Sequence, residues 1–128
     1  MASVNLIGET ISGKGDGRKY IQLPWVVQQI KKKIGFIPYP GTLNLKLNED
    51  SIKEKSRLED NASEKICPAK GYCWGLLFKA RINDVECGLV IPQTEHYPKD
   101  LIEIIAPINL RNLLQIQNGN IVKVKGYF

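Results

Sequence analysis

Histidine and cysteine are scarce in this sequence, and their scarcity limits the chemistry that the chain can support. It contains one histidine, His96, and three cysteines, Cys67, Cys73 and Cys87. Cys67 and Cys73 are too widely spaced for the pattern of a zinc knuckle, so we expect no structural zinc site. The histidine has no obvious partner of the kind that nucleophilic catalysis uses. The odd number of cysteines indicates reduced thiols and a cytoplasmic location.

Long apolar segments are also missing. No run approaches the roughly 18 residues that a membrane span needs. Residues 1–5 do not begin a charged segment followed by an apolar one, as a secretory signal would. We therefore expect no membrane association. With 43% hydrophobic and 24% charged residues, the 128-residue chain is typical of one globular domain, residues 1–128.

Positive charge exceeds negative charge, but it is not concentrated. The net charge of +5 favours anionic partners such as a nucleotide or a flavin phosphate. The only run of lysines, at residues 31–33, fits a solvated helix face better than a DNA-binding stripe. We therefore expect no nucleic-acid partner.

Short strands outnumber helices in the expected secondary structure. Alternating or β-rich segments predict strands at 4–12, 19–23, 42–47, 74–82, 85–91, 101–105 and 121–125. Apolar residues at helical spacing predict one main helix at 25–34, ended by Gly35, and a short one is expected at 109–114. Residues 48–64 are charged and weakly periodic, so we expect an irregular excursion there with at most one strand. This pattern favours a small, mostly β barrel of six strands with one main helix.

A glycine cluster follows the first expected strand. It consists of Gly13, Lys14, Gly15, Asp16, Gly17 and Arg18. Glycines let backbone N–H groups approach a phosphate closely, and the two basic residues add positive charge. The spacing is neither that of a Walker A loop nor that of a dinucleotide-binding fingerprint. On its own the cluster fits either a phosphate cradle or a simple hairpin turn at 16–17.

Two strands carry candidate ligands. Alternation within 42–47 places Thr42 and Asn44 on one face, where a hydroxyl and an amide oxygen could reach one hard cation. The same pattern is also that of an ordinary half-exposed strand. Glu103 is the only acid in residues 101–107, and it either points outward to solvent or faces a ligand.

Taken in order, these blocks resemble the archaeal-type CTP-dependent riboflavin kinase family. The matching blocks are residues 8–19, residues 35–47 with the string GTLNLKL, residues 101–107 with 109–111, and residues 118–120. They span nearly the whole chain apart from residues 48–64. The resemblance implies a cradle-loop barrel related to riboflavin-synthase-like barrels. It also implies Mg²⁺-dependent transfer of the γ-phosphoryl group of CTP to riboflavin, giving FMN and CDP.

The resemblance further implies roles for single residues. The glycine cluster (13–18) and a second segment would bind the nucleotide; the second segment comprises Ile108, Asn109, Leu110 and Arg111. Thr42 and Asn44 match the Mg²⁺ ligands, and Glu103 matches an acid that contacts the flavin and orients its 5′-hydroxyl. Thr94 matches a second flavin contact, but it lies nine residues before Glu103. The family spacing is eight, a position that Glu95 occupies, so this loop is one residue longer.

Two other functions stay open. A barrel of the same class could bind DNA, although that function would not need three alternating glycines together with GTLNLKL. A flavin-binding protein without kinase activity would be consistent with the longer loop at Thr94. We expect a monomer and no winged-helix domain before the first strand. The choice of CTP over ATP follows from the resemblance alone.

Overall fold

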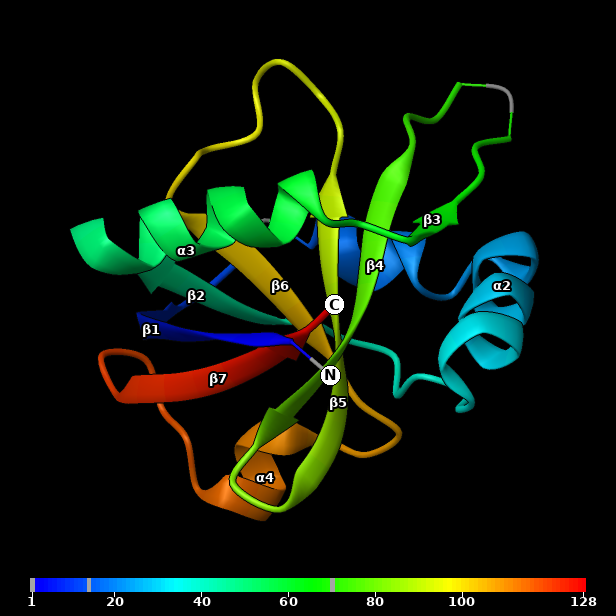
Figure 1. The fold of residues 1–128 in the computed structure, drawn as a ribbon. Coiled ribbons are helices and arrows are strands. Elements are labelled where there is room, and N and C mark those ends of the chain that lie inside the picture. Colours follow the sequence, from blue (N-terminus) through cyan, green and yellow to red (C-terminus); the bar gives the residue numbers. More distant parts are fainter. Residues whose placement is uncertain (1, 14, 70) are drawn as a thin grey trace.

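The structure, a computed structural model, describes residues 2–13, 15–69 and 71–128, and its centre is a closed barrel of six antiparallel strands. These strands are β1 (Ser3–Ile11), β2 (Leu43–Leu47), β4 (Gly75–Ile82), β5 (Val85–Pro92), β6 (Leu101–Ile105) and β7 (Ile121–Tyr127). They follow the order β4-β5-β6-β2-β1-β7, and β7 pairs back onto β4 to close the barrel (Figure 1). The short strand β3 (Glu64–Ile66) extends the sheet beyond β4. The predicted mostly β, six-stranded barrel is confirmed.

Alternate residues of the strands fill the barrel interior, as the sequence pattern predicts. Leu43 and Leu45 of β2 are at most 3% exposed and belong to the main core. In β4, Phe78 and Ala80 join the same core, while Lys79 on the opposite face is exposed. Burial of these inward-facing side chains provides most of the driving force for closing the barrel.

A second apolar cluster packs α2 (Pro24–Ile34) against the outer face of the barrel. Pro24 occupies the first turn, and Gly35 ends the helix with a φ of 91°, as predicted. The cluster consists of Ile21, Val26, Ile30, Ile66, Leu77, Val90 and Ile105. The short helix expected near residue 110 is present as α4 (Leu110–Leu114).

The glycine cluster leads into a helix, α1 (Asp16–Tyr20), and not into a strand. The predicted strand at 19–23 and the hairpin turn at 16–17 are therefore wrong. Gly15 adopts a φ of 89°, which redirects the chain, and the carboxylate of Asp16 suits the first turn of a helix. The segment then passes over the outer face of the barrel, where Ile21 is buried.

The predicted irregular excursion at 48–64 is also wrong, because most of it forms α3 (Glu49–Asp60). Asn48 caps this helix by accepting a hydrogen bond from the backbone N–H of Ser51 at 2.9 Å. With α3 as long as α2, the barrel has two main helices where one was expected, and they lie on different sides of it (Figure 1). Among the residues that the structure describes, no helix is long and apolar enough to cross a membrane.

Candidate active site

Asn44 and Glu103 lie side by side on the outer face of the barrel. Asn44 of β2 is the register partner of Glu103 of β6, and Val90 of β5 faces Glu103 from the other side. All three alternate with interior residues, so their side chains project away from the main core. Asn44 is nevertheless only 8% exposed, because other parts of the chain cover this face.

Three oxygen-bearing side chains meet at this position. The Thr42 hydroxyl lies 3.3 Å from Asn44 Oδ1 and 3.3 Å from Glu103 Oε1. We call Thr42, Asn44 and Glu103 the oxygen cluster. Asn44 comes from β2, Thr42 immediately precedes that strand, and the acid comes from β6, so the register of β2 and β6 fixes the spacing of Asn44 and Glu103.

Gly13 and Gly17 of the glycine loop (residues 13–18) lie directly against the oxygen cluster. A Cβ atom added at Gly17 would collide with Glu103 Oε1 and would come within 2.8 Å of the Thr42 hydroxyl. A Cβ atom added at Gly13 would collide with the Asn44 amide. The loop backbone can approach these side chains this closely only because both positions lack side chains of their own.

The predicted residues of the glycine loop differ in their exposure to solvent. Gly15, Asp16 and Arg18 are exposed, and Lys14 lies outside the described residues. The base of the loop is tied to α4, since Arg111 donates to the Ile11 carbonyl at 3.2 Å. Through this contact the glycine loop and the second predicted nucleotide segment lie next to each other.

A cavity of about 130 Å³ lies between that second segment and Thr42 of the oxygen cluster. It is lined by Tyr39, Gly41, Thr42, Leu43, Ile104, Ala106, Ile108, Asn109, Leu110 and Arg111. Ile108 is exposed, whereas Leu110 is buried in the main core. Asn109 caps α4 and also donates to the Tyr39 hydroxyl at 3.3 Å. The four residues of the second predicted nucleotide segment and the predicted metal ligand Thr42 thus line one cavity.

Glu103 experiences opposing influences on its ionisation. Burial raises the pKa of this carboxyl above its usual value, and the nearby charge of Asp16 acts in the same direction. Hydrogen bonds from Tyr97 and Thr42 stabilise the carboxylate and oppose the shift. A half-buried acid with a raised pKa that contacts a cavity-lining residue is a candidate for a catalytic role.

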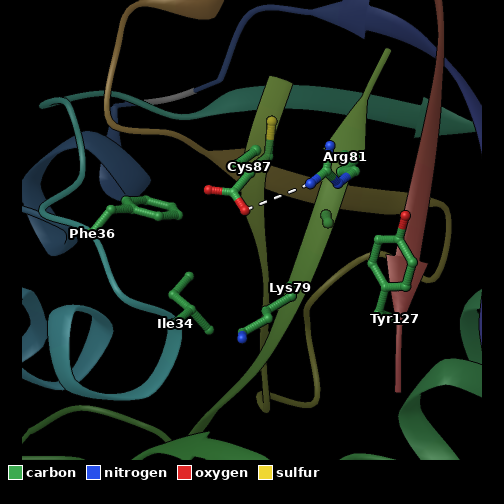
Figure 2. A pocket seen from close by; sticks show the side chains of 8 residues that line it. Ile34, Phe36, Lys79, Arg81, Cys87 and Tyr127 are labelled. Atoms are coloured by element: carbon green, nitrogen blue, oxygen red, sulfur yellow. Dashed lines mark ion pairs between the residues drawn. The ribbon is translucent and has the colours of Figure 1, made fainter. Parts of the chain in front are cut away.

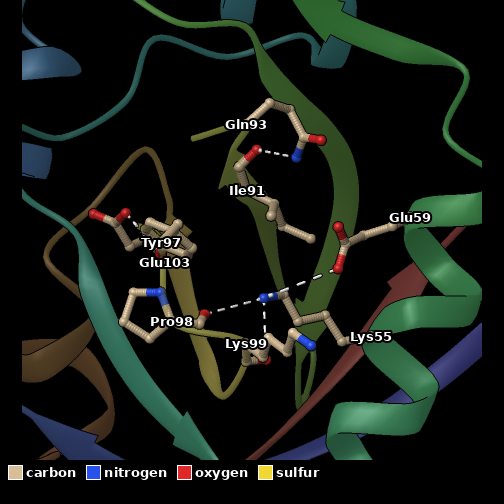
Figure 3. Close-up of polar contacts among 8 residues, drawn as sticks. All are labelled: Lys55, Glu59, Ile91, Gln93, Tyr97, Pro98, Lys99 and Glu103. Atoms are coloured by element: carbon tan, nitrogen blue, oxygen red, sulfur yellow. Dashed lines mark hydrogen bonds and ion pairs between the residues drawn. The ribbon is translucent and has the colours of Figure 1, made fainter. Parts of the chain in front are cut away.

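Sequence reasoning missed Tyr97. Its hydroxyl donates to Glu103 Oε2 at 2.9 Å, a shorter hydrogen bond than the one between Thr42 and Glu103 (Figure 3). Thr94 and Glu95, the two candidates for the flavin contact in the same loop, are both exposed. No hydrogen bond within the described part of the chain joins the Thr94 side chain to Glu103. An aromatic residue six positions before the acid was the only available signal.

Three aromatic rings gather near this site. Tyr20 of α1 lies 5.9 Å from Trp25 and 6.2 Å from Tyr72, and the rings of Trp25 and Tyr72 are 5.3 Å apart. The Tyr20 hydroxyl is buried and has no hydrogen-bond partner among the described residues. Burial raises the pKa of Tyr20, and the charges of Cys73 and Glu103 add to this effect. Tyr20 also lies close to β5, since its hydroxyl and the side chain of Val90, the register partner of Glu103, both come within 3.7 Å of the position that a Cβ atom would take at Gly75.

A larger hollow of about 260 Å³ lies elsewhere, on the outer face of β4 and β5 (Figure 2). It is lined by Ile34, Phe36, Lys79, Ala80, Arg81, Glu86, Cys87 and Tyr127. Arg81 and Glu86 form an exposed ion pair at 3.7 Å across its edge. None of the residues predicted for a site lines this hollow, so the candidate active site is the smaller cavity with the oxygen cluster.

The donor set suits a hard cation only in part. No group of three or more His, Cys, Asp or Glu residues within the described ranges could hold a metal ion by itself. The oxygen cluster offers two neutral oxygens and one carboxylate, which are the atom types that Mg²⁺ prefers. A magnesium ion here would need further oxygen ligands, such as phosphates or water.

Comparisons with known proteins agree on one family. The family model CTP-dep_RFKase, described as a domain of unknown function (DUF120), matches residues 10–125. A riboflavin kinase of Pyrobaculum aerophilum is 42% identical over 132 residues, which is 98% of this chain and 61% of that protein. A riboflavin kinase of Archaeoglobus fulgidus is 36% identical, covering 96% of this chain and 54% of that protein. The chain therefore spans less than two thirds of the length of these two relatives.

Proposed function

Because the chain belongs to the CTP-dependent riboflavin kinase family, we propose that it transfers the γ-phosphoryl group of CTP to the 5′-hydroxyl of riboflavin with Mg²⁺, giving FMN and CDP. The observation that carries the proposal is the contact of the glycine loop with the oxygen cluster. Phosphoryl transfer needs in-line positioning and stabilisation of charge more than covalent chemistry. The backbone at Gly13 and Gly17, which carries no side chains, lies beside the three oxygen-bearing side chains, and together they could meet both needs in one place.

Each part of the site has a role in this proposal. The backbone N–H groups of the glycine loop and the charge of Arg18 bind the phosphates of CTP. Asn109 and Arg111 line the cavity that receives the rest of the nucleotide. Glu103 orients the riboflavin hydroxyl and accepts its proton as the phosphoryl group arrives.

Thr42 and Asn44 are the residues that would hold the metal ion. When bound, Mg²⁺ neutralises negative charge on the transferred phosphoryl group. Both residues are neutral, and Mg²⁺ exchanges its water for such ligands reluctantly. We therefore expect isothermal titration calorimetry to show weak Mg²⁺ binding to the protein alone and stronger binding with CTP present. Equally tight binding without nucleotide would contradict this assignment.

The aromatic group of Tyr20, Trp25 and Tyr72 suits the flat ring system of riboflavin. Stacking on an aromatic side chain contributes about 1 kcal/mol, and Tyr72 is 48% exposed and free to contact a ligand. We expect Tyr72→Ala to raise the KM for riboflavin by about fivefold with kcat largely kept. Tyr72→Phe, which retains the ring, is the matched control and should behave as wild type. A normal KM in Tyr72→Ala would place the flavin ring elsewhere.

One chromatographic assay tests the proposed function. The protein is incubated with riboflavin and Mg²⁺, with CTP or ATP supplied in parallel, and FMN is measured. FMN formed with CTP and much less with ATP supports the proposal. Flavin that binds without turnover would favour a flavin-binding protein, and salt-dependent DNA affinity without flavin binding would favour a DNA-binding module.

A further inference from the structure

The only buried charged side chain among the described residues belongs to Lys55 of α3. It is 4% exposed, and burial lowers the pKa of this amine while the charges of Glu59 and Asp100 oppose that shift. Burying a charge is costly unless other groups compensate for the lost water. The contacts of Lys55 therefore indicate what its burial achieves.

Those contacts are directed at one loop. The Lys55 ammonium donates to the carbonyl of Lys99 at 3.1 Å and to that of Pro98 at 3.4 Å, and Glu59 lies 3.9 Å away (Figure 3). The same ammonium lies 5.5 Å from the centre of the Tyr97 ring, within the range of a cation–π interaction. One side chain thus fastens three consecutive residues of the loop before β6.

Tyr97 is the residue of this loop that reaches the active site. Its hydroxyl donates to Glu103 Oε2 at 2.9 Å, while Glu103 Oε1 faces Thr42. A carboxylate held at both oxygens keeps one orientation, and a phosphoryl acceptor must be oriented to within a fraction of an ångström. The contacts form a chain from Lys55 through Tyr97 to Glu103.

We propose that Tyr97 is a positioning residue for Glu103 and that Lys55 holds the loop that presents Tyr97. The inference rests on the proposed function, since it concerns the acid that orients the riboflavin hydroxyl. It gives α3, which lies in the segment 48–64, a role in the site. Neither Tyr97 nor Lys55 contacts the substrate; both act through Glu103.

Tyr97→Phe is the primary test, because it removes one hydroxyl and keeps the ring over Lys55. We expect kcat for FMN formation to fall about tenfold, while the KM for riboflavin changes less than about twofold. Tyr127→Phe, at the distant hollow, is the matched control and should retain wild-type kcat. A normal kcat, or a raised KM with kcat retained, would overturn the positioning role.

Lys55→Met tests the other half of the proposal, with Lys53→Met at an exposed position of the same helix as its control. We expect Lys55→Met to lower kcat and the Lys53 variant to leave it unchanged. In the Tyr97→Phe background, Lys55→Met should lower kcat little further, because both act through one contact. Independent, multiplying losses would overturn the chain of contacts. If Lys55→Met does not fold, Lys55→Gln replaces it. Its neutral side chain removes the cation over the Tyr97 ring, so kcat should again fall, and a normal kcat would overturn the role of Lys55.

A stability cycle separates this inference from the proposed function. The free energy of unfolding is measured for wild type, Tyr97→Phe, Glu103→Ala and the double variant. Non-additive changes show that the two side chains are coupled, and additive changes overturn the inference whatever the activity. If wild type forms no FMN while the coupling is present, the proposed function fails and the positioning of Glu103 by Tyr97 stands.

Discussion

Glu103→Gln is expected to lower kcat by about 10²- to 10⁴-fold while affinity for riboflavin stays within a few-fold of wild type. Glutamine has the shape of glutamate and can still accept the hydrogen bond from Tyr97, but it cannot take up the proton of the riboflavin hydroxyl. Steady-state kinetics with riboflavin as the varied substrate measures both quantities. A loss of affinity equal to the loss of rate would make Glu103 a flavin-binding residue and not a base.

The stability of the same variant provides its control. Burial raises the pKa of Glu103, so the folded protein favours the protonated carboxyl. Folding is therefore disfavoured as the pH rises above the ordinary pKa of a glutamate, and the neutral amide avoids this cost. We expect Glu103→Gln to unfold at neutral pH at a temperature equal to or above that of wild type. The loss of rate would then be chemical and not a consequence of unfolding.

Gly17→Ala is expected to reduce kcat/KM by about 10²-fold, which a misplacement of about 1 Å can cost. The new methyl group would occupy the position of Glu103 Oε1 and would press on the Thr42 hydroxyl. Thr42 is stiff about its first side-chain torsion, so the Glu103 carboxylate must move and lose its present hydrogen bonds. The assay is FMN formation at several riboflavin and CTP concentrations.

Gly126→Ala is the matched control for this substitution. A Cβ atom there would meet Leu58 at 3.3 Å, in the core and not at the active site. We expect that variant to lose some thermal stability and to keep its kcat. Alanine within α1 favours the helix, so Gly17→Ala should fold. A folded Gly17→Ala protein with normal activity would show that the loop does not lie against the acid during turnover.

Strands such as β1 and β7 could be predicted because they alternate cleanly between core and surface. GTLNLKL shows three leucines inward and three polar residues outward, and this pattern survives in β2. The helix α3 was missed because its buried face includes Ser51 and Lys55, whose polarity hides the helical period. Its cap by Asn48 and the acids in its first turn were the available signals.

The site was predictable only where residue type limits the chemistry. Glycines at positions 13 and 17 indicated a close approach, and the structure brings them against Asn44 and Glu103. Tyr97 could not be found in this way, because a tyrosine in a loop is usually unremarkable. Its role depends on Lys55, 42 residues earlier in the chain, and on contacts that only the folded barrel creates.

The oxygen cluster stands on the outside of the barrel, while Leu45 and Ile102, which are register partners and do not line the candidate cavity, face the inside. Substitutions that repack this part of the interior, for example to tolerate heat, can therefore be selected without altering the proposed catalytic and metal-binding groups. Thermal stability and the proposed chemistry thus depend on opposite faces of the same strands, so the stability could be improved without changing the site.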